Sequence, residues 1–193
     1  GAAASPGQLA IGTLLQRDPW QFLPMNHLGV AAPGLGLLMA ALMRPHGRAG
    51  TVRLASDDPT IDPQVDFALL DDQRDVTSLA AAVRVALDLL ATPPFREVVE
   101  EVYIDALGTT GAALGDDASI EQWVRGAVGD YVHASSTCAM GPVVDDDGRL
   151  VGYDGIFVCD ASVFPSIPDV NTHLPTTMLA ERLSARWLRQ PSG

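Results

Sequence analysis

Residues 131–180 read YVHASSTCAMGPVVDDDGRLVGYDGIFVCDASVFPSIPDVNTHLPTTMLA. This stretch holds both cysteines and two of the four histidines, His133 and His173. Between the histidines, residues 155–159 read GIFVC, a short apolar run before an aspartate that is typical of a buried strand. A proline suited to the first turn of a helix follows the second histidine. We therefore expect a strand at 155–159 and a closing helix at 176–188.

Composition and charge narrow the classes of protein to which the chain belongs. Its 193 residues, 47% of them apolar, are enough for one domain with a core. The net charge of −12 and the absence of lysine disfavour nucleic acid and anionic lipid as partners. We find no apolar run that suits a membrane span and no basic leader, so we expect a cytoplasmic protein. The two cysteines lack metal-ligand spacing, and we expect no metal site.

Periodicity and turn signals predict the elements outside the quoted stretch. Apolar residues recur every three or four positions over 71–91, which predicts an amphipathic helix that ends at Pro93-Pro94. Residues 20–25 alternate well enough for a strand. A Ser-x-x-Gln capping box predicts a second helix at 119–128. Residues 57–67, rich in Asp and Pro, should form an irregular connection.

Three motifs in the quoted stretch follow one another in a fixed order. They are H-A-S-S-T-C-A-M-G from His133, D-A-S-V-F-P from Asp160 and N-T-H-L-P-T-T-M from Asn171. With these motifs the chain resembles the C-terminal part of the glucose–methanol–choline (GMC) family of flavoprotein oxidoreductases. That family carries H-x-x-G-T-C-x-M-G, D-A-S-x-x-P and N-T-[HN]-x-P-T-x-M blocks. Ser136 stands where the family usually has glycine, and Ala139 where it often has arginine.

The resemblance implies a fold. Composition alone leaves residues 34–43 open between a helix and a buried strand. The family has a strand here, leading into an R-P-x-S-R-G-x-V block that residues 44–52 match. We therefore expect strands at 35–43 and 51–54 as neighbours in one antiparallel sheet. The expected class is α+β: a mainly antiparallel substrate-domain sheet with packed helices, plus a C-terminal strand and helix that belong to the FAD-binding domain.

The resemblance also implies a division into domains. Residues 1–17 would be a loose N-terminal segment, 18–154 the substrate-binding domain, and 155–193 the strand and helix that complete the FAD-binding domain. The family's Gly-x-Gly-x-x-Gly motif for FAD does not occur in the sequence. We therefore expect a C-terminal portion whose partner is a missing N-terminal FAD-binding half. Alone, it should be inactive, retain no FAD and self-associate through exposed apolar surface.

The same resemblance implies chemistry for the two histidines. It implies that His133 is the base that takes the hydroxyl proton of a small-molecule alcohol, while hydride passes to FAD. Imidazole suits this role because it can be neutral near pH 7. His173 is implied to hydrogen-bond the substrate oxygen. Apart from its motif, a histidine beside a tyrosine is most often a structural hydrogen-bonding residue.

Six further residues are implied to lie at the flavin. Asp160 and Ala161 would lie near its ribityl and pyrophosphate groups. The segment under the isoalloxazine ring would include four residues: Asn171, Leu174, Pro175 and Thr176. The ordinary alternative for all six is turn and helix-cap chemistry.

Two other functions stay open. Some relatives are hydroxynitrile lyases that contain FAD on the same scaffold, and a fragment without the N-terminal half would be non-catalytic. The acidic run at 145–148, DDDG, lacks the spacing of a calcium-binding loop, and we expect a polar hairpin turn there.

Overall fold

The structure is a computed structural model of the chain that describes residues 15–17, 19–25, 35–47 and 49–189. It divides into two compact units. The first unit comprises the described residues up to 47 together with 70–128. The second comprises the described residues of 48–69 and 129–193. The division into domains at 17/18 and 154/155 stays a prediction.

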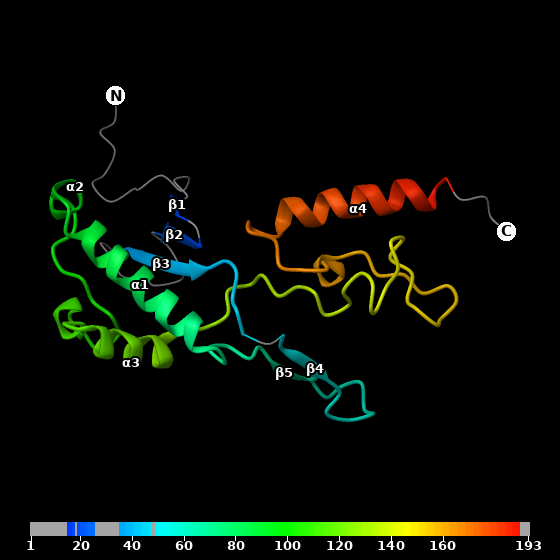
Figure 1. Cartoon of the computed structure of the whole chain (residues 1–193), viewed down its shortest axis with the longest axis horizontal. Coiled ribbons are helices and arrows are strands. Elements are labelled where there is room, and N and C mark those ends of the chain that lie inside the picture. Colours follow the sequence, from blue (N-terminus) through cyan, green and yellow to red (C-terminus); the bar gives the residue numbers. More distant parts are fainter. Residues whose placement is uncertain (1–14, 18, 26–34, 48, 190–193) are drawn as a thin grey trace. The chain divides into compact units, whose positions relative to one another are not determined.

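The first unit combines a small antiparallel sheet with helices. Strands β1 (Leu15–Arg17), β2 (Trp20–Met25) and β3 (Leu37–Leu42) pair in the order β1-β2-β3. Helix α1 (Gln73–Leu90) lies against β3, and α3 (Asp117–Ala127) packs on α1 (Figure 1). The α+β class is therefore confirmed. The strand predicted at 20–25 and the helix predicted at 71–91 are confirmed as β2 and α1.

The core of the first unit lies between α1 and α3. Four buried apolar residues form this cluster: Ala80 on α1, Leu114 in the segment between the helices, and Ile120 and Val124 on α3. Half-buried apolar side chains, among them Leu79, Val83 and Trp123, pack against this cluster. The three- and four-residue spacing seen in the sequence thus forms the buried face of α1.

Helix starts differ in detail from the sequence-based predictions. α3 begins at Asp117, and its capping box pairs Asp116 with Ser119, so Ser119 is not the cap itself. Asp116 lies one residue before the helix and can accept from the Ser119 backbone N–H. Pro93 and Pro94 do not merely follow α1: they start the short helix α2 (Pro93–Arg96), where a missing N–H is harmless.

The prediction that 35–43 and 51–54 are neighbouring strands is wrong. β3 pairs with β2, whereas β4 (Thr51–Arg53) pairs with β5 (Gln64–Asp66) in a separate two-stranded sheet. β5 also lies inside the segment predicted to be irregular. The physical reason is local pairing: β4 and β5 are close in sequence and complete each other's ladder, as β2 and β3 do. After β3 the chain makes a turn at His46 and Gly47 that is bonded to α1.

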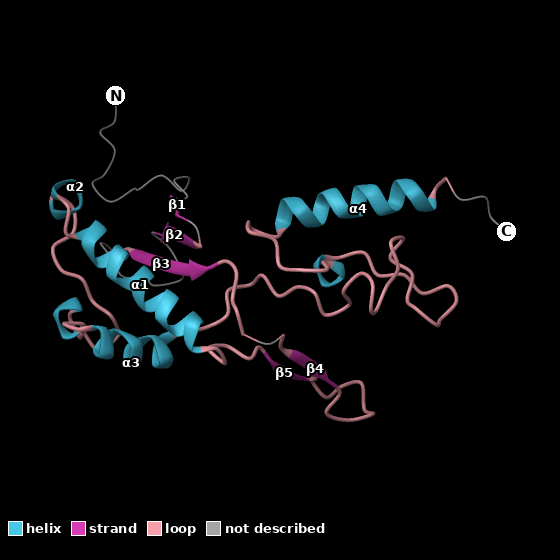
Figure 2. Ribbon diagram, viewed as in Figure 1, coloured by secondary structure: helices cyan, strands magenta, loops and turns pink. Residues whose placement is uncertain are grey.

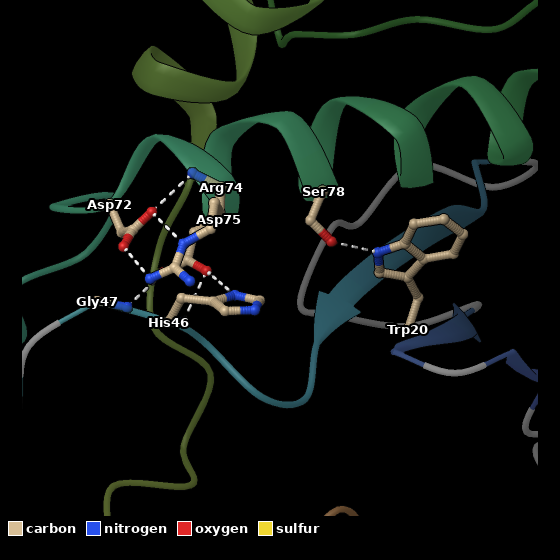
Figure 3. A network of polar contacts seen from close by, with 7 residues as sticks. All are labelled: Trp20, His46, Gly47, Asp72, Arg74, Asp75 and Ser78. Carbon is tan, nitrogen blue, oxygen red and sulfur yellow. Dashed lines mark hydrogen bonds and ion pairs between the residues drawn. The ribbon is translucent and has the colours of Figure 1, made fainter.

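Asp75 holds that turn. Its carboxylate is buried and accepts hydrogen bonds from His46 N at 2.8 Å, Gly47 N at 3.0 Å and His46 Nδ1 at 3.0 Å (Figure 3). Further along α1, the Trp20 indole donates to Ser78 Oγ at 2.9 Å, which ties β2 to the same helix. A buried carboxylate must be hydrogen-bonded, and here the donors come from the turn that follows β3.

The second unit consists largely of loop between residues 129 and 172 (Figure 2). It contains β4, β5, the short 3₁₀ turn η2 (Ala161–Val163) and helix α4 (His173–Trp187). Its core includes Val144, Val163 and Leu183. Of the N-terminal segment predicted to be loose, the described residues 15–17 form β1 in the first unit.

The strand predicted at 155–159 does not form. Only a single bridge, Arg149 to Phe157, pairs this segment, and Ile156 and Phe157 are exposed. A buried strand needs a ladder on at least one side, and one bridge is too little to make one. The last helix is confirmed, but it begins three residues earlier than predicted, so Pro175 is its third residue. That position has no intrahelical N–H bond to lose.

The predicted hairpin turn at 145–148 is confirmed. The Asp145 carboxylate accepts from the N–H groups of Asp147 and Arg149, each at 2.9 Å, and Gly148 N donates to the Asp145 carbonyl. The Arg149 N–H is the main cause that lowers the pKa of Asp145. Within the part of the chain that the structure describes, no helix is long and apolar enough to cross a membrane.

Replacing Asp75 with alanine should lower the free energy of unfolding by about 3 kcal/mol, because the three hydrogen bonds to the turn are lost together. Asp88→Ala, at an exposed position of the same helix, should change it by less than about 0.5 kcal/mol. Urea unfolding of the two variants measures both values. Equal losses would show that the Asp75 contacts do not stabilise the fold.

The Asp72 carboxylate should make the stability of the fold depend on pH. Its carboxylate caps α1, and the side-chain hydrogen bond from Arg74, followed by the Arg74 backbone N–H, lowers the pKa of Asp72 from 3.8 to about 2. A lowered pKa means that the ionised cap stabilises the fold above about pH 4, and that this is lost as the pH falls through 2. Asp72→Asn still caps but does not titrate.

The stability difference between wild type and Asp72→Asn should therefore be largest near neutral pH and should shrink below about pH 4. Urea unfolding of both proteins between pH 7 and pH 2 measures it, and the other carboxylates cancel in the comparison. A difference that stayed constant over this range would contradict the assignment.

Candidate functional site

All eight residues that the sequence analysis singled out lie in the second unit, on the loop before η2, at η2 and at the start of α4. His133 is the only one of them with a ring nitrogen shielded from solvent and lacking a hydrogen-bond partner among the described residues: this atom is Nε2. Its other ring nitrogen, Nδ1, lies 3.2 Å from the Val132 carbonyl oxygen and 3.2 Å from Thr172 Oγ1. The two nitrogens therefore have different surroundings.

The backbone around His133 has an uncommon conformation. Val132 has φ +42°, in the left-handed region that a β-branched residue rarely adopts. The Tyr131 and His133 rings meet edge-on, with 6.0 Å between their centroids. Residues held in such conformations cluster at functional sites, where the surrounding structure keeps them in place.

His173 is the first residue of α4 and is exposed. Its neighbour Thr172 contacts His133, so the structure brings the beginning of α4 to the first histidine. The Thr172 carbonyl accepts from Thr176 N at 2.9 Å and from Thr176 Oγ1 at 2.7 Å, which holds the first helical turn. Thr172 thus links the two predicted catalytic residues, because it directly precedes His173 and its hydroxyl contacts His133.

Asp160 and Ala161 are tied to the His133 loop through the backbone. Ser136 N, Cys138 N and Met140 N donate in turn to the carbonyls of the three residues of η2, Ala161, Ser162 and Val163, at 3.2, 2.8 and 3.0 Å. Asp160 caps η2 by accepting from Ser162 N at 2.8 Å. Burial, then the nearby Asp160 carboxylate, raises the pKa of the Cys159 thiol, which disfavours its thiolate.

Ser136 has φ +67°, a conformation that favours glycine. This accounts in physical terms for the glycine that the resembling motif carries at this point. Serine can adopt the same conformation at a cost of about 1 kcal/mol, and its N–H still reaches Ala161. The departure at Ser136 therefore keeps the loop geometry. Ser136 and Thr137 also line a shallow pocket of about 320 Å³ with residues 50–53.

The remaining predicted residues lie around the first turn of α4. Asn171 and Leu174 are exposed, whereas Pro175 and Thr176 are half-buried. Leu174 is 75% exposed and Met178, one turn on, is 65% exposed, so one side of the helix start is apolar and exposed among the described residues. Sequence reasoning missed Thr172 and Val132 as partners of His133. The hydroxyl residue directly before His173 was the available signal for Thr172.

α4 is fixed to the rest of the second unit at its other end. The Trp187 indole donates to the Asp147 carbonyl at 2.7 Å and its ring meets Phe157 at 5.1 Å. Arg186 Nε pairs with Asp147 Oδ1 at 2.6 Å, and Leu183 is fully buried. The 145–148 turn thus sets where the helix lies, and with it the position of the helix start beside His133.

Comparison with known proteins gives a consistent result. The family model described as GMC oxidoreductase matches residues 45–180. The chain is 34% identical, over 98% of its length, to 5-(hydroxymethyl)furfural oxidase of Methylovorus sp. (strain MP688), and covers 38% of that protein. It is also 34% identical, over 88% of its length, to an oxygen-dependent choline dehydrogenase of Paraburkholderia phymatum, of which it covers 31%.

Solved structures share the fold. A variant of formate oxidase from Aspergillus oryzae RIB40 superposes with a TM-score of 0.74 at 21% identity, over 86% of this chain and 31% of that one. The chain thus spans about a third of the length of the relatives that it matches.

A glycine substitution tests how firmly the turn positions α4. Gly148 has φ +73°, and a Cβ here would lie 2.6 Å from the Val158 carbonyl oxygen and 3.3 Å from Leu183. Gly152 has φ +82°, but a Cβ there meets nothing within 4 Å. Gly152→Ala should lower the free energy of unfolding by about 1 kcal/mol from its backbone alone.

Gly148→Ala should cost about 2 kcal/mol more than Gly152→Ala, because the close approach adds to the same backbone penalty. Urea unfolding of both variants gives the difference. If the two alanine variants lost the same stability, the 145–148 turn would not be closely packed under α4.

Proposed function

The chain belongs to the GMC oxidoreductase family, and we propose from this that it is the C-terminal portion of a flavin-dependent alcohol oxidoreductase. In the intact protein, FAD would supply the acceptor for the hydride that leaves the CH–OH carbon. His133 would take the proton of the substrate hydroxyl. The oxidoreductase names of the two curated relatives support this class of reaction, and one of them acts, by its name, on a hydroxymethyl compound.

The observation that carries the proposal is the state of His133 Nε2. This atom is shielded from solvent and has no partner among the described residues, although buried polar atoms are normally hydrogen-bonded. A neutral imidazole that donates its one N–H from Nδ1, as the contact with the Val132 carbonyl favours, has a lone pair on Nε2 for a proton. Such an atom fits a general base whose partner is the substrate.

The residues at the start of α4 would support substrate and flavin. His173 would hydrogen-bond the substrate oxygen as negative charge develops on it. Asp160, which caps η2, and Ala161, its first residue, would lie at the flavin, as would Asn171, Leu174, Pro175 and Thr176. The backbone N–H groups at the helix start and the positive end of its dipole suit the negative charge that a reduced flavin carries.

The rest of the protein would come from a partner that this chain lacks. The exposed apolar side chains of the α4 start, Leu174 and Met178, would be covered by the N-terminal FAD-binding half. The chain alone would then retain no FAD and be inactive. The chain spans about a third of the length of its two curated relatives, which supports the proposal that further residues complete the FAD site.

The test is anaerobic mixing of the full-length flavoprotein with small alcohols, choline and 5-(hydroxymethyl)furfural among them, followed by visible absorbance. An alcohol should bleach the flavin of the wild-type protein. His133→Ala should keep the flavin content but slow bleaching at least about 100-fold, because the base is lost. His46→Ala, whose ring contacts Asp75 in the first unit, should bleach within about two-fold of wild type.

Equal bleaching rates in His133→Ala and wild type would remove His133 as the base. Turnover of a cyanohydrin without any bleaching would instead identify a hydroxynitrile lyase. A protein that binds flavin but acts on neither class would support the non-catalytic alternative.

A further inference from the structure

We propose that Thr172 is a positioning residue for His133. Its hydroxyl, together with the Val132 carbonyl, holds the imidazole as the tautomer with its proton on Nδ1, which leaves the Nε2 lone pair as the proton acceptor. This inference rests on the proposed function, in which His133 is the base. It adds a residue that the sequence motifs leave without a role.

The Val132 carbonyl sets the direction of the proton. A carbonyl oxygen only accepts hydrogen bonds, so at 3.2 Å from Nδ1 it is satisfied only when Nδ1 carries the hydrogen. A neutral imidazole carries one N–H, so Nε2 then has the lone pair. The opposite tautomer would turn the Nδ1 lone pair toward the carbonyl lone pairs, which is repulsive.

The conformation of Val132 indicates that this carbonyl is held in place. Its φ of +42° is unfavourable for a β-branched side chain and persists only where the surroundings impose it. The strained peptide therefore presents its oxygen to the ring of the next residue. One contact from an adjacent residue leaves the ring free to tilt, however, and a second contact is needed to fix it.

Thr172 supplies the second contact, and its hydroxyl does not cap α4. It is the N-cap residue of α4, where a threonine hydroxyl commonly accepts from a backbone N–H of the first turn. Here the hydroxyl makes no such cap bond and lies 3.2 Å from His133 Nδ1. The hydroxyl can accept from the same Nδ1–H that faces Val132. Because a hydroxyl could also donate to Nδ1, the carbonyl selects the tautomer, and the Thr172 contact keeps the ring aligned with that carbonyl.

The threonine is itself fixed. Its carbonyl accepts from both the N–H and the hydroxyl of Thr176, and its branched side chain has few rotamers. The position of the His133 ring is therefore tied to the first turn of α4, which carries His173. An enzyme whose base and substrate-binding group share one rigid support keeps them in register.

The test uses the full-length flavoprotein with ¹⁵N-labelled histidine. Nitrogen NMR reports which ring nitrogen of His133 carries the proton, and the signal that disappears in His133→Ala identifies it. Three forms are compared: wild type, Thr172→Val, which keeps the branched shape without a hydroxyl, and Thr172→Ser, which keeps the hydroxyl. The rate of flavin bleaching by the best alcohol is measured on the same samples.

We expect wild type and Thr172→Ser to carry the proton on Nδ1 and to bleach at similar rates. Thr172→Val should show a mixture of tautomers and bleach about ten-fold more slowly, with unchanged flavin content and little change in KM. A purely structural role for Thr172 would lower thermal stability without moving the nitrogen signals.

A wild-type protein with the proton on Nε2 would overturn the proposal, and this result needs no variant to fold. A Thr172→Val protein with wild-type tautomer and rate would overturn it as well. If no alcohol bleached the wild-type flavin, the proposed function would fail, whereas the nitrogen signals would still decide how the ring is held.

Discussion

The backbone hydrogen bonds between residues 136–140 and η2 are the contact on which the proposed site depends. They join the loop that carries His133 to the segment that leads into α4, and they need no particular side chain. What they do need is a chain that can bend, which Ser136 provides through its positive φ. Val132 and Ser136 in this loop both have positive φ, and the Ser136 N–H makes the first of the bonds to η2. A site assembled in this way is specified by backbone conformation first and by side-chain chemistry second.

The same region shows how a helix start can serve two tasks. Thr176 and Thr177 hold the first turn of α4, because their hydroxyls donate to carbonyls four residues earlier. The Thr172 hydroxyl makes no cap bond to this turn and contacts His133 instead. At its far end the helix is fixed through Leu183, Arg186 and Trp187 to the 145–148 turn. The position of a ring nitrogen near one end is in this way linked to packing about three helical turns away.

Sequence reasoning succeeded where one local pattern determines one local outcome. The apolar period over 71–91 became α1, the alternation over 20–25 became β2, and the acidic run at 145–148 became a turn. It failed on the pairing of strands. β4 pairs with the nearby β5 and not with β3, and 155–159 has no ladder beside it among the described residues. For the site, the motifs predict His133 and His173, and these roles stay predictions. Spacing could not reveal that Thr172 contacts the His133 ring, because that contact crosses 39 positions.

The division into two units has a consequence for how the protein is made. Residues 48–69 belong with 129–193, although 70–128 complete the other unit. During synthesis the first unit has all of its residues once position 128 has left the ribosome. The β4–β5 hairpin must wait for residues 129–193 before its own unit is complete. Chaperones can bind, or misassembly can occur, in the time between the synthesis of the hairpin and that of residues 129–193. The order of the elements along the gene sets this time.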